Sequence, residues 1–110
     1  MADTIKKVAY YYATVDDKAG EGARVLDALK QGGVNLLAFH AFPAGSGKAQ
    51  LDLVPQDEAK LTQAAGKAGI KLSARKTVFL IEGQDRPGAM AEILGKLGAA
   101  KINVTAVDAV

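Results

Sequence analysis

The feature that most constrains the fold of this chain is an internal similarity between two segments that lie 68 residues apart. The residues that match at this spacing without a gap include Asp17 with Asp85, Gly20 with Gly88, and Asn35 with Asn103, besides several leucines and alanines. Leucine and alanine matches would arise between any two amphipathic helices, whereas these Asp, Gly and Asn matches would not. We therefore interpret the chain as a tandem duplication, a pattern that must be recognised before a fold is assigned.

Residues 8–73 alternate between strand patterns and helix patterns. β-Branched and aromatic residues, or apolar alternation, predict strands over 8–15, 34–42, 49–54 and 70–73. Apolar residues at helical spacing, followed by glycine, predict helices over 22–31 and 57–68. This β-α-β-β-α-β order is typical of an α+β, ferredoxin-like sandwich, with an antiparallel sheet and both helices on one face.

The same pattern begins again after residue 73 and stops early. A strand is expected over 77–82, a helix over 89–100 and a strand over 102–110. We therefore expect one complete domain over residues 8–75 and a second over 76–110, truncated after β-α-β. Either another chain covers the open strand edge at 78–81, or the natural sequence continues beyond Val110. The clean stop at the end of a strand favours the second explanation.

The segment from Gln84 to Gly88 joins a predicted strand to a predicted helix. Asp85 is expected to cap that helix, and Pro87 suits its first turn because the missing N–H would have no partner there. Gly88 allows backbone or a ligand to approach closely. Free amide hydrogens at the N-terminus of a helix favour an anion.

The composition excludes several classes of function. A net charge of +2 without a basic block argues against a nucleic-acid partner. The absence of cysteine excludes disulfides, thiol catalysis and cysteine-ligated metals. The N-terminal segment resembles neither a signal peptide nor a membrane span, so we expect a cytoplasmic protein without a membrane partner.

No residue pattern indicates catalysis, a metal or a cofactor. The single histidine, His40, has no cysteine or second histidine beside it, and we interpret it as a packed or solvent-edge residue. The carboxylates of Asp16, Asp17 and Asp85 are better explained as helix caps than as an acid/base pair. Residues 45–48 join two strands and open no helix, so they predict a hairpin turn and not a phosphate loop. We expect a protein that is not an enzyme.

Apolar residues occupy both faces of the strands predicted at 8–15, 34–42 and 78–81. Helices can cover only one face of such a sheet, so we expect a homo-oligomer, most simply a dimer. RNA-binding proteins of this fold stack bases on aromatic residues of the sheet, and this chain has three consecutive aromatic residues, Tyr10, Tyr11 and Tyr12. Because successive residues of a strand alternate faces and no basic strand accompanies them, packing is the favoured explanation.

At Asp85-Arg86-Pro87-Gly88, followed by an apolar-periodic helix and Ile102-Asn103-Val104, the chain resembles an ACT domain. This family consists of small regulatory modules attached to many enzymes of amino-acid metabolism. The resemblance covers one complete copy, residues 8–75, and the first half of another. The chain is similar above all to small tandem ACT proteins that carry no enzymatic domain.

The resemblance implies allosteric binding of an amino acid at an interface between two such domains. The residues that it assigns to the ligand are Gln84, Asp85, Arg86, Pro87, Gly88, Ala89 and Asn103. The equivalent residues of the first copy, Asp17, Gly20 and Asn35, form a second candidate site. That copy lacks the proline, and Gly22 weakens the start of its helix, so the resemblance there is less complete.

We therefore expect a non-enzymatic regulatory protein that binds a small amino acid between ACT-like domains. The alternative is a structural or partner-binding module without ligand affinity. An RNA-binding ferredoxin-like domain is a further alternative, with less support from the charge of the chain.

Overall fold

The computed structural model describes residues 3–110 of the chain. Its elements follow in the order β1 (Thr4–Asp16), α1 (Glu21–Gln31), β2 (Leu36–Gly45), β3 (Lys48–Pro55), α2 (Glu58–Ala68), β4 (Lys76–Glu82) and α3 (Ala89–Ala99). The chain divides into two compact units, one over Lys6–Leu80 and one that comprises Ile81–Val110 and the start of the chain up to Ile5. The domain boundaries expected from the sequence, 8–75 and 76–110, remain a prediction.

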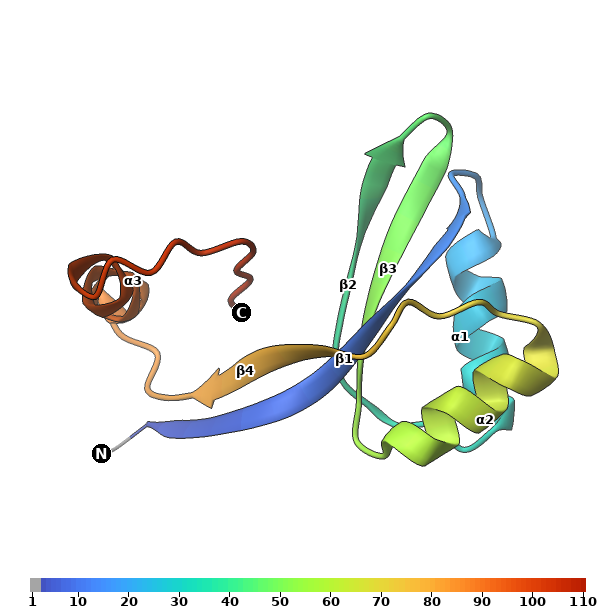
Figure 1. The fold of residues 1–110 in the computed structure, drawn as a ribbon, viewed down its shortest axis with the longest axis horizontal. Coiled ribbons are helices and arrows are strands. Elements are labelled where there is room, and N and C mark those ends of the chain that lie inside the picture. Colours follow the sequence, from blue (N-terminus) through green and yellow to red (C-terminus); the bar gives the residue numbers. More distant parts are fainter. Residues whose placement is uncertain (1–2) are drawn as a thin grey trace. The chain divides into compact units, whose positions relative to one another are not determined.

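The strands form one four-stranded sheet in the order β2-β3-β1-β4 (Figure 1). β3 runs antiparallel to both of its neighbours, and Leu53 lies opposite Tyr11 of β1 and Phe39 of β2. Both α1 and α2 lie on the same side of these strands (Figure 1). The expected class, an α+β ferredoxin-like sandwich, is thereby confirmed.

The core lies between this side of the sheet and the two helices. Alternate residues of β1, including Tyr11 and Val15, point into it and are buried. The most completely buried large side chains come from α1, β3 and α2: Val25, Leu29, Leu53 and Leu61. Tyr10 and Tyr12 belong to the other face and are only half-buried, as the alternation of the strand predicts.

Helices α1 and α2 approach each other closely at Gly32, the residue that ends α1. A Cβ atom built on Gly32 would lie 2.4 Å from the Cβ atom of Ala64. Any larger residue at position 32 would therefore force the two helices apart. At the start of α2, Asp57 Oδ1 accepts hydrogen bonds from the amides of Ala59 and Lys60, which confirms that the helix opens at this aspartate.

The strand expected over residues 70–73 is wrong, because only Leu72 forms a bridge to β1, opposite Ala13. Next to this bridge, the Ser73 amide donates to the Tyr12 carbonyl (2.8 Å), and Ser73 Oγ accepts from the Tyr12 amide (2.9 Å). A serine side chain has therefore replaced a backbone partner, and regular pairing stops. The fourth position of the sheet belongs instead to β4, which was expected to open the second copy.

The strand expected over residues 102–110 is also wrong, since the structure assigns no strand there. Apolar composition alone does not form a strand, because the backbone needs a neighbouring strand to accept its hydrogen bonds. β2, in contrast, is longer than expected and continues through Pro43 to Gly45. Proline is tolerated at this position because β2 is an edge strand. No helix within residues 3–110 is long and apolar enough to cross a membrane.

Candidate functional site

The turns that lead into α1 and α3 have the same backbone geometry. In each, the amide of the fourth residue donates to the carbonyl of the first, over 3.4 Å in residues 18–21 and 3.2 Å in residues 86–89. The third residue is Gly20 in one turn and Gly88 in the other, with φ of 90° and 82°. This is the geometry of a type II turn, whose third position suits glycine because a Cβ atom disfavours positive φ. Pro87 occupies the second position, which proline also favours.

This geometry corrects the expected caps of both helices. The N-cap residues are Gly20 and Gly88, and neither helix has a side-chain cap. Asp85 therefore does not cap α3, and Pro87 precedes the helix instead of lying in its first turn. Asp17 likewise lies too early in the chain to cap α1. Each helix is started by the turn itself. The carbonyl of the turn's glycine accepts the first helical hydrogen bond, at 2.9 Å in both helices.

The C-terminal ends of α1 and α3 correspond equally closely. Val34 donates to the Leu29 carbonyl (3.0 Å), and Ile102 donates to the Leu97 carbonyl (2.9 Å). The preceding residue has positive φ in both copies, 71° at Gly33 and 60° at Lys101. Both ends form the same Schellman-type closure. The two strand–turn–helix segments thus keep the 68-residue spacing in their backbone as well as in their sequence.

The charges around the two turns differ. In the first, Glu21 at the start of α1 contacts Arg24 (2.8 Å) and Lys18 (3.8 Å). In the second, the equivalent helical position is Ala89, and Arg86 of the turn pairs instead with Glu92. The hydrogen bond from Arg86 lowers the pKa of Glu92. The first turn of each helix therefore carries one carboxylate, at the first residue of α1 (Glu21) and at the fourth residue of α3 (Glu92).

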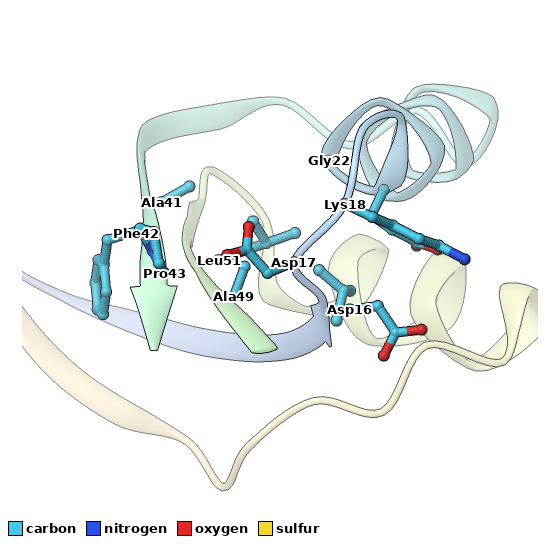
Figure 2. Close-up of a pocket in the computed structure, with 11 residues that line it drawn as sticks. Asp16, Asp17, Lys18, Gly22, Ala41, Phe42, Pro43, Ala49 and Leu51 are labelled. Atoms are coloured by element: carbon cyan, nitrogen blue, oxygen red, sulfur yellow. The ribbon is translucent and has the colours of Figure 1, made fainter. Parts of the chain in front are cut away.

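A groove lies at the first turn, between the end of β1 and the β2–β3 hairpin, with a volume of about 270 Å³ (Figure 2). Figure 2 shows Ala41 and Pro43 of β2 on one side and Lys18 of the turn on the other, with Leu51 of β3 between them. One wall is apolar and consists of Val15, Ala41, Pro43, Ala49 and Leu51. The other is charged and consists of Asp16, Asp17, Lys18 and Glu21.

Strand register explains why these apolar side chains meet. Val15 and Pro43 both lie opposite Ala49, and Ala41 lies opposite Leu51, so all five share the face that carries the core. Phe42 also lines the groove, but it lies opposite Gln50 on the other face, where its ring centroid is 5.3 Å from that of His40. The groove is thus the uncovered end of the hydrophobic core.

Among the carboxylates of the charged wall, two have cationic partners. Asp16 Oδ1 accepts a hydrogen bond from Lys48 Nζ at 2.7 Å, which lowers the pKa of Asp16. Glu21 pairs with Arg24 and Lys18, as described above. Asp17 is exposed and has no ion-pair partner within residues 3–110, while its amide is fixed by a 2.9 Å hydrogen bond to the Gly47 carbonyl. Asp17 is therefore the carboxylate that a positively charged group can reach.

The asparagines of the candidate sites lie far from the turns of their own copies. The eleven residues of α1 separate Gly20 from Asn35, and the eleven residues of α3 separate Gly88 from Asn103. At 1.5 Å per residue, each helix spans about 16 Å. Asn35 contacts instead the segment between β3 and α2, where its Nδ2 donates to Gln56 Oε1 (3.2 Å). One copy therefore does not bring its turn and its asparagine together.

The candidate residues of the second copy form an exposed segment. Residues Gln84 to Gly88 are exposed, Ala89 is half-buried and Asn103 is exposed. Their role in binding remains a prediction. Sequence reasoning missed the apolar wall at residues 41–51, and the only signal for it was the alternation of Ala49, Leu51 and Leu53. No group of three or more His, Cys, Asp or Glu side chains suitable for a metal ion occurs within residues 3–110.

The sequence of this chain matches no family model and no curated protein. Its fold, an α+β sandwich of the class described above, does recur in solved structures. The regulatory subunit of aspartate kinase from Thermus thermophilus, in its ligand-free form, is similar with a TM-score of 0.69 and 14% identity, over 98% of this chain and 80% of that subunit.

Two further structures show the same likeness. Protein BT0572 from Bacteroides thetaiotaomicron has a TM-score of 0.65 and 20% identity, over 87% of this chain and 65% of that protein. The allosteric aspartate kinase of Clostridium acetobutylicum has a TM-score of 0.61 and 16% identity, over 98% of this chain and 28% of that enzyme. At these identities the likeness establishes a shared fold.

Proposed function

We propose that this chain is a non-enzymatic, ACT-type regulatory protein that binds a small amino acid at the strand-to-helix turn of its first copy. The observation that supports this most directly is the groove between that turn and the β2–β3 hairpin. It joins an apolar wall to a charged wall around a volume of about 270 Å³. The shared fold with regulatory subunits of aspartate kinase agrees with a regulatory role.

The charges of the groove suit a zwitterion. The ligand's ammonium group would pair with Asp17, whose carboxylate has no ion-pair partner within residues 3–110. Its carboxylate would lie near Lys18 and the first amides of α1, at Gly22, where the helix dipole favours negative charge. The internal repeat allows a second location for the amino-acid site, at the equivalent turn of the second copy, Gln84 to Ala89.

Asn35 enters the site only if a second chain supplies it, because α1 separates it from the turn of its own chain. A two-fold axis perpendicular to α1 would set the two copies of α1 antiparallel and so bring Asn35 of one chain to the turn of the other. The proposal therefore includes a homodimer with the ligand at its interface. The match of Asn35 with Asn103 at the 68-residue spacing supports a role for this amide in both copies.

The first test is a thermal-melt screen of the full chain against the twenty amino acids. A ligand at about a hundred times its dissociation constant adds roughly 2.7 kcal/mol of stability, and about 1 kcal/mol moves the midpoint of a small domain by several degrees. We expect Asp17→Asn to abolish the shift and the matched variant Asp85→Asn to retain it. The reverse result would move the site to the second turn, and a flat panel would favour a partner-binding module.

A mixing experiment tests the shared site. Asp17→Asn and Asn35→Ala chains should each bind poorly alone, since every site in either homodimer lacks one partner. A heterodimer of the two carries one doubly altered site and one intact site. Because about half of the dimers in an equal mixture are heterodimers, mixing should restore roughly a quarter of the binding capacity. If both groups acted within one chain, mixing would restore nothing.

A further inference from the structure

The two walls of the groove differ in what they offer to a ligand's side chain. The charged wall comes from the turn after β1, and its reachable carboxylate is Asp17. The apolar wall consists of side chains without a polar atom, from Val15, Ala41, Pro43, Ala49 and Leu51. A ligand whose ammonium group rests on Asp17 would direct the rest of the molecule along this apolar wall (Figure 2).

The partners of the charged wall are already committed to one another. Lys48 pairs with Asp16, Arg24 pairs with Glu21 at 2.8 Å, and Lys18 contacts Glu21 only at 3.8 Å. Lys18 and Asp17 are therefore the charges at the groove, one of each sign, that a ligand can engage. This pair is matched by the ammonium and carboxylate groups that every amino acid carries. A third charge, on the ligand's side chain, would lie against the apolar wall without a partner, and burial of an unpaired charge is strongly unfavourable.

From this division, and on the basis of the proposed function, we infer that the groove selects amino acids with apolar, branched side chains, leucine and valine above all. Burial of each additional methylene group on the apolar wall favours binding about fourfold. Alanine would bind more weakly because it leaves the wall uncovered. Lysine and aspartate would bind more weakly because their side-chain charges would lose water without gaining a partner.

The volume of the groove agrees with a ligand of this size. At about 270 Å³ it lies just below the range of pockets that hold drug-sized molecules, roughly 300–1,000 Å³. Ala41 and Ala49 contribute only methyl groups to the wall, and their small size provides the space for a branched side chain. Residue 41 therefore controls how large a side chain the groove accepts.

The deciding experiment is calorimetric titration of the full chain with L-leucine, L-valine, L-alanine, L-lysine and L-aspartate. We expect leucine and valine to bind at least tenfold more tightly than alanine, and lysine and aspartate to bind more weakly than leucine. Tighter binding of lysine or aspartate would overturn the inference while the proposed function stands. Absence of binding by all five would also overturn the inference, and the proposed function would fall with it only if the thermal-melt screen of all twenty amino acids were flat.

A size swap at residue 41 locates the apolar wall independently. Ala41→Leu fills the groove, so it should weaken leucine binding at least tenfold and change alanine binding less. Ala44→Leu is the matched control, because residue 44 is exposed on the same strand and does not line the groove. Equal effects of the two variants would overturn the assignment of this wall. The titrations of the unmodified chain decide the selectivity even if Ala41→Leu does not fold.

Discussion

Gly20 and Gly88 hold the third position of their turns at positive φ and accept the first hydrogen bond of the helix that follows. A Cβ atom at either position would meet no atom within 4 Å, so a lack of space for a methyl group does not explain the choice of residue. The backbone conformation does, because a Cβ atom disfavours the left-handed region. Each turn depends on one residue, and the sequence match between the two copies follows from that requirement.

Gly20→Ala should therefore lower the free energy of unfolding by about 1 kcal/mol. Urea unfolding monitored by circular dichroism measures the change. Gly66→Ala is the control, since Gly66 lies inside α2 without positive φ and has no atom within 4 Å of an added Cβ. It should raise the stability by about 0.5–1 kcal/mol. Two variants of equal effect would show that Gly20 is not held in the left-handed region.

Among the elements, Glu58 connects three segments that lie far apart in the sequence. The Tyr11 hydroxyl of β1 donates to Glu58 Oε1 (2.8 Å), and Arg75, just before β4, donates from Nε to the same oxygen (2.8 Å). Hydrogen bonds from Arg75 and then Tyr11 lower the pKa of Glu58, and the bond to Glu58 raises the pKa of Tyr11. The start of α2 is thereby tied to β1 and to the approach of β4.

This arrangement predicts a pH-dependent stability. A carboxyl group whose folded-state pKa is lowered stabilises the fold above its unfolded pKa of about 4.3, and the effect is lost as pH falls through the folded value. Glu58→Gln should therefore have a lower urea midpoint than the unmodified chain at pH 7, and the difference should shrink toward pH 3. Glu82→Gln, at a glutamate whose side chain has no hydrogen bond or ion pair within residues 3–110, is the control. A constant difference across this range would contradict the role of the carboxylate.

The sequence predicted the elements that depend on residues close together in the chain. It missed the features that depend on contacts between residues far apart in the chain. The helices and the β2–β3 hairpin follow from periodicity and glycines within a few residues. The pairing of Ser73 Oγ with the Tyr12 amide, which interrupts the expected strand, depends on residues 61 positions apart and leaves no local signal. The groove was missed for the same reason, because its apolar wall forms only when β2 and β3 come into register with β1.

At the scale of the whole molecule, β2 is an edge strand with two apolar side chains that the helices do not cover. Leu37 is 46% exposed and Phe39 is 40% exposed. Pairing of β2 with a second chain would extend the sheet and cover both side chains. Leu37→Lys combined with Phe39→Lys should convert a dimer into a monomer in sedimentation velocity, whereas Leu94→Lys on α3 should leave the dimer intact. A monomeric unmodified chain at all concentrations would contradict this prediction.

The matched ends of α1 and α3 make the two segments exchangeable parts. Residues 17–35 and 85–103 have equal length, begin with an aspartate directly before a type II turn, and end with the same closure and an asparagine. A gene in which one segment replaces the other would therefore need no redesign of the junctions. Such chimeras would separate what each segment contributes through its own side chains from what it gains through its position in the chain.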